Sequence, residues 1–154
     1  MNSEVREIQV ACFRLKDDLY AVDIMRIKEI IRPQKLTPLP HAPSFIDGII
    51  NLRGAVIPVV DLRKRFDMPA REVTMQTRLL IVRLSGQTLG LVVDDVAEAI
   101  TIPVNDIKPP PAVSDGLIEN HLLGVCLSGD DLVMLLDIDR LLTTNEVSDL
   151  GVFV

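Results

Sequence analysis

Aromatic residues and positive charge are both scarce in this chain. Phe, Tyr and Trp together make up 3% of the 154 residues, and Trp is absent. Surfaces that bind single-stranded nucleic acid stack bases on aromatic rings, so such a surface is not expected here. The 22 acidic residues outnumber the 16 Lys and Arg, which gives a net charge of −6. Because phosphate contacts require clustered Lys and Arg, the composition excludes a general nucleic-acid binder.

Cysteine and long apolar runs are also limited. Cys12 and Cys126 are the only two cysteines, and each lies in an apolar run where a free thiol behaves as a small hydrophobic side chain. Two such thiols do not form a disulfide framework, which favours a reducing compartment. The charged start has no apolar core of a secretory signal, and no run approaches the roughly 18 apolar residues that span a bilayer. We therefore expect a cytoplasmic protein without membrane insertion.

The usual sequence patterns of catalysis are missing as well. His41 and His121 have no local metal-ligand partner, no CxxC or HExxH motif occurs, and the eight glycines are isolated. Tandem carboxylates occur at 94–95, read as the exposed end of a strand, and at 130–131, read as a turn. Neighbours in a strand point to opposite faces, so a tandem pair cannot line one cleft. We expect no enzyme, cofactor or metal; a small acid–base hydrolase built on the first pair and His41 remains an alternative.

What the chain has in quantity is Val, Ile and Leu, within a hydrophobic content of 48%. These residues favour β-structure. Short apolar runs bounded by Gly, Pro and Asp predict strands at 8–15, 19–23, 56–60, 79–84, 89–93, 122–126 and 132–136. Turn-forming residues at 16–18, 85–87 and 128–130 predict three hairpins. The spacing indicates an all-β barrel or sandwich.

A few segments depart from this strand pattern. Short helices are predicted at 42–48 with Ser44 as N-cap, at 61–66, and from Asp137 to 142 or as far as 147. The basic run at 63–65 is read as a solvated helix face. The proline-rich segment 102–120 is predicted to be an extended connector, because proline fixes φ and removes an amide donor.

The chain also repeats itself. An offset of 69 aligns residues 13–15 with 82–84 and 20–22 with 89–91, and an offset of 76 aligns Gly48 with Gly124 and Asp61 with Asp137. We interpret this as a duplicated β-module, with chance similarity between two Val/Leu-rich stretches as the alternative. The halves are 8–77 and 78–142, with exchange of strands between them allowed, followed by a tail at 143–154. A module of this size is marginal alone, so the halves should share an apolar interface and unfold together.

Two charged residues lie in very apolar surroundings. Glu29 lies in the segment RIKEII, with isoleucines at 27, 30 and 31, and Arg53 ends the run IINLR just before another buried segment. An unpaired buried charge is costly, so Arg53 requires either a carboxylate partner, an exposed position or a functional reason. Spacing alone does not decide between these readings.

At these residues the sequence resembles the CheW family of bacterial chemotaxis coupling proteins. The motifs are PSFIDG at 43–48, IINLRG at 49–54 and IPVVDLR at 57–63, with further matches at 20–30, 89–96 and 135–142. The resemblance covers residues 9–142. It implies a single CheW-like domain over 1–154 made of two SH3-like five-stranded β-barrels, with short helices including one near the C-terminus. It also implies a non-catalytic adaptor that couples a CheA-type histidine kinase to the cytoplasmic tip of methyl-accepting chemotaxis receptors.

The resemblance further implies two sets of contact residues. The positions expected to contact the receptor are Ile27, Gly48, Asn51, Arg53, Leu79 and Ala99. The positions expected to contact the kinase regulatory domain are Glu29, Arg53, Lys108 and Val113. An Arg and a bulky aromatic residue are expected at the last two positions, so Lys108 and Val113 predict weaker ring closure. This departure keeps open a role in a non-flagellar pathway such as pilus motility. The isolated protein is expected to be a monomer.

Overall fold

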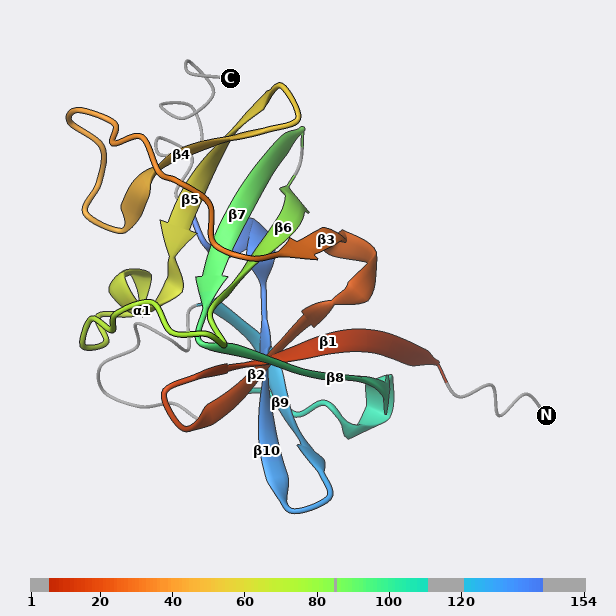
Figure 1. Cartoon of the computed structure of the whole chain (residues 1–154). Coiled ribbons are helices and arrows are strands. Elements are labelled where there is room, and N and C mark those ends of the chain that lie inside the picture. Colours follow the sequence, from red (N-terminus) through yellow and green to blue (C-terminus); the bar gives the residue numbers. More distant parts are fainter. Residues whose placement is uncertain (1–5, 85, 111–120, 143–154) are drawn as a thin grey trace.

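The chain forms two five-stranded sheets, seen as the lower and upper parts of the molecule in Figure 1. The computed structural model describes residues 6–84, 86–110 and 121–142. Sheet A has the strand order β8-β1-β2-β10-β9, and sheet B has the order β3-β6-β7-β5-β4. The strands are β1 (Glu7–Leu15), β2 (Asp18–Asp23), β3 (Ile27–Ile31), β4 (Ile46–Leu52), β5 (Ala55–Asp61), β6 (Arg78–Leu84), β7 (Gln87–Val93), β8 (Asp95–Pro103), β9 (Leu122–Ser128) and β10 (Asp131–Leu136). The predicted all-β class is confirmed, with the two SH3-like barrels here called barrel A and barrel B after their sheets.

Each sheet draws strands from both halves of the sequence. The first half supplies β1 and β2 to sheet A and β3 to β5 to sheet B, whereas the second half supplies β6 and β7 to sheet B and β8 to β10 to sheet A. The two strand orders are the same when each strand is replaced by its counterpart five strands away. The chain therefore crosses between the sheets twice, between β2 and β3 and again between β7 and β8.

The three predicted hairpins are present. β1 pairs antiparallel with β2, β6 with β7 and β9 with β10. Their turns carry the left-handed backbone that such loops need, with φ of 56° at Lys16, 73° at Gly86 and 62° at Gly129. The residues of each turn therefore favour pairing of the two strands that they connect.

The predicted helix at 42–48 is wrong. The amide of Ile46 donates to the carbonyl of Pro43 at 3.0 Å, which forms a turn, and β4 begins at Ile46. The amide of Asp61 then donates to the carbonyl of Phe45 at 2.8 Å, so this backbone is already committed to pairing with the end of β5. The sheet partner overrides the local capping signal of Ser44.

Two other predicted helices are short. α1 (Leu62–Arg65) follows β5, and the Asp61 side chain caps it by accepting from the amides of Arg63 and Lys64. After β10, η4 (Ile138–Arg140) is a single 3₁₀ turn capped by Asp137. The predicted extension of that helix beyond 142 lies outside the described residues. The segment 102–120, predicted to be extended, begins with the end of β8 and the 3₁₀ turn η2 (Val104–Asp106), and residues 111–120 lie outside the described part.

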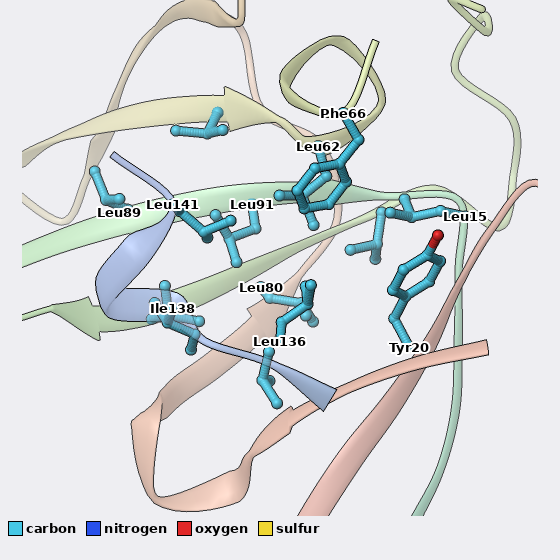
Figure 2. Close-up of a cluster of buried hydrophobic side chains, with 14 of the residues drawn as sticks. Leu15, Tyr20, Leu62, Phe66, Leu80, Leu89, Leu91, Leu136, Ile138 and Leu141 are labelled. Carbon is cyan, nitrogen blue, oxygen red and sulfur yellow. The ribbon is translucent and has the colours of Figure 1, made fainter. Parts of the chain in front are cut away.

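The largest apolar cluster lies between the two sheets (Figure 2). Tyr20 and Leu136 enter it from sheet A, Leu80 and Leu91 enter it from sheet B, and Phe66 closes it beside α1. Tyr20 is 1% exposed and stacks on Phe66 with ring centroids 6.4 Å apart. Because both sheets share this core, neither can retain its packing without the other.

Each barrel has an additional core of its own, and two equivalent positions carry side chains of different size in the two cores. Cys12 and Cys126 lie in the core of barrel A at the positions that Ile81 and Ile50 occupy in barrel B. Both thiols are free and buried, as predicted. Burial is the main cause that raises the pKa of the Cys12 thiol to about 11.

Candidate functional site

The charged pair predicted from the sequence joins the two outer strands of sheet B. Glu29 lies on β3 at one edge of the sheet, and Arg53 lies in the turn between β4 and β5 at the other. Their side chains form an ion pair, with 31% of Glu29 and 68% of Arg53 exposed. The sheet must curl for its two edges to meet, so the ion pair marks the seam of barrel B. The sequence left open whether Arg53 has a carboxylate partner, an exposed position or a functional reason, and the structure shows both a partner and exposure.

The turn that carries Arg53 is preorganised. Arg53 and Gly54 have φ of 51° and 87°, the pair of left-handed residues typical of a two-residue hairpin loop. The side-chain oxygen of Asn51 accepts from the amide of Gly54 at 2.9 Å. Asn51 therefore lies beside Arg53 and holds the loop, and both side chains are exposed. We call Ile27, Glu29, Asn51 and Arg53 the seam surface.

Gly48, which is predicted to contact a receptor, is buried beside the outer edge of β4. Thr37 and Ile49 exchange two backbone hydrogen bonds of 2.9 and 2.8 Å, which covers the outer edge of β4. A Cβ at Gly48 would lie 2.5 Å from the carbonyl oxygen of Thr37. The absence of a side chain at Gly48 thus permits this intramolecular contact, and its assignment to the receptor-contact set stays a prediction.

The second barrel repeats this arrangement at Lys108. Lys108 and Val125 exchange two backbone hydrogen bonds of 2.8 Å across the edge of β9, and a Cβ at Gly124 would lie 2.6 Å from the Lys108 carbonyl oxygen. The exposed Lys108 also lines a hollow of about 270 Å³ together with Leu127 and Leu132. Val113, its predicted neighbour in the kinase-binding set, lies outside the described residues.

The remaining predicted contact residues differ in accessibility. Ile27 is half-buried at the start of β3 and packs against the core between the sheets. Ala99 is exposed on β8, the outer strand of sheet A. Leu79 is only 2% exposed inside barrel B, where it packs with Ile50 and Ile57. The assignment of Leu79 to the receptor-contact set therefore rests on the resemblance alone and stays a prediction.

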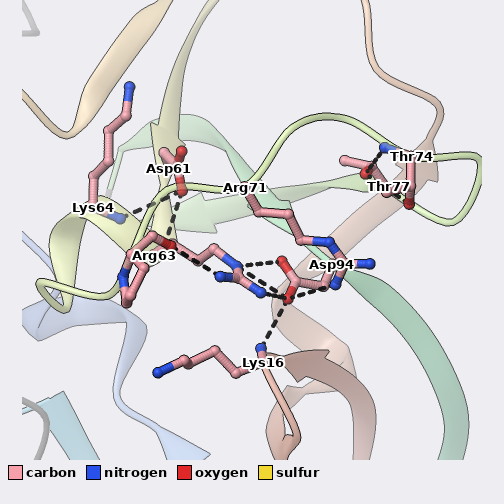
Figure 3. Close-up of polar contacts among 9 residues, drawn as sticks. Lys16, Asp61, Arg63, Lys64, Arg71, Thr74, Thr77 and Asp94 are labelled. Atoms are coloured by element: carbon pink, nitrogen blue, oxygen red, sulfur yellow. Dashed lines mark hydrogen bonds and ion pairs between the residues drawn. The ribbon is translucent and has the colours of Figure 1, made fainter.

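The most elaborate polar network was not predicted as such (Figure 3). Arg63 from α1 donates to Asp94 through Nε at 2.8 Å and through Nη2 at 2.5 Å, and the two side chains are 10% and 8% exposed. The amide of Lys16 donates to the same carboxylate at 2.8 Å, and Arg71 approaches it at 3.4 Å. The expectations of a solvated helix face at Arg63 and an exposed strand end at Asp94 are therefore wrong.

Asp94 occupies the second crossing between the sheets. It links β7 of sheet B to β8 of sheet A, and its amide donates to the carbonyl of Arg14 on β1 at 3.0 Å. Burial would raise the pKa of the Asp94 carboxyl, but the hydrogen bonds from Arg63 and the Lys16 amide outweigh it and lower the pKa. A carboxylate held ionised by an arginine is a joint of the fold and a poor proton donor. The hydrolase alternative therefore loses its first candidate acid.

Metal-ligating clusters and long apolar helices are both absent from the described residues. Within residues 6–84, 86–110 and 121–142, no group of three or more His, Cys, Asp and Glu side chains could hold a metal ion. In the same part of the chain, no helix has the length and apolar character required to cross a membrane. The features that stand out are exposed: a seam with a charged pair, and a hollow lined by leucines.

The described part of the chain is thus a scaffold of two packed β-barrels with an exposed charged turn at the seam of barrel B. Residues 9–146 match the CheW-like domain model, and the chain belongs to the CheW-like family. It is 33% identical over 151 residues to the chemotaxis protein CheW of Treponema pallidum, covering 94% of this chain and 88% of the relative. It is 39% identical over 140 residues to protein FrzA of Myxococcus xanthus, covering 90% and 87%.

Among solved structures, the scaffolding protein TtCheW from Thermoanaerobacter tengcongensis is similar. Its TM-score is 0.83 at 35% sequence identity, with 95% of this chain and 94% of that chain covered. The likeness therefore extends over both barrels.

Proposed function

We propose that this protein is a non-catalytic adaptor of chemotaxis signalling, which couples a CheA-type histidine kinase to the cytoplasmic tip of methyl-accepting receptors. The observation that carries the proposal is the match to the CheW-like family over residues 9–146, together with similarity to proteins named chemotaxis protein CheW and scaffolding protein. The two exposed regions described above give such an adaptor two places at which partners can bind.

The seam surface is the first of these places. Glu29 and Arg53 offer both signs of charge at the rim, and Ile27 offers a half-buried apolar side chain beside them. Charged rims steer association and set the register of a complex, while affinity comes from apolar contact. The seam surface is proposed to contact the receptor tip and one face of the kinase regulatory domain, and Ala99 on β8 is proposed as a further receptor contact.

The hairpin of β9 and β10 is the second place. Leu123, Leu127 and Leu132 are 55%, 71% and 51% exposed, which is unusual for large apolar side chains that have no partner. The repeat assigns the polar residues Asp47 and Asn51 to the positions of Leu123 and Leu127. The same scaffold position is thus polar in one barrel and apolar in the other. With Lys108 at its border, this surface is proposed to dock the kinase regulatory domain.

Binding measurements with purified partners test the proposal. The wild-type protein should bind the regulatory domain of a CheA-type kinase and a soluble receptor tip, each with micromolar affinity, about −8 kcal/mol. Arg53→Ala should weaken binding at the seam surface, and Leu127→Glu should weaken binding to the kinase domain. Arg32→Ala, an exposed residue just beyond β3, serves as the matched control for loss of positive charge. A folded wild-type protein that binds neither partner would contradict the proposal.

The similarity to protein FrzA favours a second candidate, a coupling protein of a non-flagellar chemosensory pathway. The same scaffold and surfaces would serve it, with a different kinase and receptor. Deletion of the gene distinguishes the two candidates. Loss of swimming chemotaxis supports the first, and a defect confined to surface motility supports the second.

A further inference from the structure

Each of the two crossings between the sheets carries one member of an ion pair, an acidic residue at one crossing and a basic residue at the other. At the second crossing, Asp94 binds Arg63 of α1. At the first crossing, η1 (Ile24–Arg26) carries Arg26, which binds Asp139 of η4. The offset of 76 places Asp139 at the position of Arg63. Both ion pairs therefore tie a crossing to the short helix after the last strand of a half-chain, β5 or β10, with acid and base exchanged.

At the first crossing, a side chain makes the hydrogen bond to β6 whose counterpart at the second crossing is made by the backbone. Arg26 Nη1 donates to the carbonyl of Arg83 on β6 at 2.9 Å. At the other crossing, the backbone amide of Asp94 donates to the carbonyl of Arg14, and the offset of 69 makes Arg14 the counterpart of Arg83. A backbone donor is retained in every substitution except proline, whereas the arginine contact is lost with the side chain.

The ion pair at the first crossing is also more open to water. The side chains of Arg26 and Asp139 are 37% and 49% exposed, against 10% and 8% for the buried pair. Hollows of about 320 and 490 Å³ are both lined by Arg26 and Asp139. Solvent-exposed pairs gain little net free energy and are screened by salt. The pair can therefore open without unfolding the core between the sheets.

What this pair holds is the beginning of β3. Arg26 directly precedes Ile27, which pairs with Val82, and the register of β3 on β6 then shifts before Glu29. The start of the strand is thus held by one regular pair of residues, by the packing of Ile27 against the core between the sheets and by the contacts of Arg26. Ile27 and Glu29 are both residues of the seam surface, so the orientation of that surface depends on the Arg26 contact.

We propose that Arg26 and Asp139 are positioning residues, which hold β3 against barrel A and so set the geometry of the seam surface for its partner. The inference rests on the proposed function for the identity of that partner. Substitution should weaken binding without unfolding the protein. Modulation of a coupled site by residues that do not touch the ligand is commonly modest, and we expect about a fivefold to tenfold rise in Kd.

The test uses Arg26→Gln, Asp139→Asn and the charge-exchanged double variant Arg26→Asp/Asp139→Arg. Binding to the purified regulatory domain of a CheA-type kinase is measured by calorimetry, with urea unfolding and hydrogen exchange of β3 amides measured in parallel. Both single variants should bind more weakly and exchange β3 amides faster, with an unchanged unfolding midpoint. The double variant should recover part of the affinity, because it restores the ion pair but not the hydrogen bond to the carbonyl of Arg83. Arg140→Gln is the matched control, because it removes an arginine of the same η4 whose ion pair is with Asp137, three residues earlier in the chain.

The outcomes separate this inference from the proposed function. Wild-type affinity and wild-type β3 exchange in Arg26→Gln overturn the positioning role, as does a loss of affinity equal to that of Arg140→Gln. If the wild-type protein binds no kinase domain, the proposed function fails. Faster β3 exchange in Arg26→Gln and Asp139→Asn would then still support the control of β3 by this pair, and unchanged exchange would overturn it.

Discussion

Removal of the Asp94 carboxylate is expected to destabilise the protein by about 3–5 kcal/mol, because it breaks a buried ion pair and leaves the other charge uncompensated. In Asp94→Ala, the guanidinium of Arg63 stays in a site where it is 10% exposed, with the carbonyl of Pro69 as a remaining acceptor at 2.9 Å. The amide of Lys16 loses its acceptor as well. Since a domain is commonly stable by only about 5–15 kcal/mol, the loss is a large fraction of the total.

Urea unfolding followed by circular dichroism measures this change. Asp94→Ala and Arg63→Ala should each lower the unfolding midpoint strongly. The apolar double variant Arg63→Met/Asp94→Leu should be more stable than either, because it leaves no unpaired buried charge. Arg53→Ala, which breaks the exposed ion pair with Glu29, should cost less than about 1 kcal/mol. A midpoint of Asp94→Ala within error of wild type, or additive losses in the double variant, would refute the assignment of Asp94 as a buried joint.

Three further predictions concern acid stability, a glycine and the thiols. The pKa of Asp94 in the folded protein lies below its ordinary value of 3.8, so the ionised carboxylate stabilises the fold above that pH, and this stabilisation is lost as the pH falls through the lower folded value. In Asp94→Asn, the free energy of unfolding should therefore fall less steeply with decreasing pH than in the wild type, and equal slopes would disagree with this. Gly48→Ala places a Cβ 2.5 Å from the backbone of Thr37 and should lower the free energy of unfolding by about 2–3 kcal/mol. Gly54→Ala, where a Cβ would have no atom within 4 Å, should lower it by only about 1 kcal/mol through backbone strain, and equal unfolding midpoints would contradict this order. With its pKa raised to about 11, Cys12 should resist a thiol reagent at neutral pH until urea unfolds the protein, and rapid labelling of the folded protein would count against its burial.

The hairpins and the barrel class could be predicted because their determinants are local. Turn residues such as Gly86 and Gly129 adopt left-handed φ between two apolar runs, and each run pairs with its neighbour in sequence. The strands β3 and β8 were missed because they are outer strands that carry charged residues such as Glu29 and Glu98, which interrupt the apolar pattern. Strand β4 was mistaken for a helix in part because its pairing with β5 is not visible in its own sequence.

The buried joint could not be predicted from local spacing. Arg63 and Asp94 are 31 residues apart, and each resembles an ordinary surface charge in its own segment. The repeat contained a usable signal, because its offsets place Arg63 opposite Asp139 and Asp94 within one position of Arg26. Charges that exchange sign between equivalent positions of two copies indicate pairs across their junctions. The burial of Gly48 and Leu79 likewise depends on segments distant in sequence, Thr37 for the one and the interior of barrel B for the other.

The exchange of strands between the two barrels gives the chain the form of a symmetric dimer of half-chains joined end to end. In a dimer of identical halves, every substitution appears twice, so one surface cannot change without the other. Joining the halves removes that constraint while the shared core keeps them together. One copy then carries Arg53 at its turn and the other carries Gly129, and one carries Asn51 where the other exposes Leu127. A scaffold with two equivalent faces has thereby become one with two different faces.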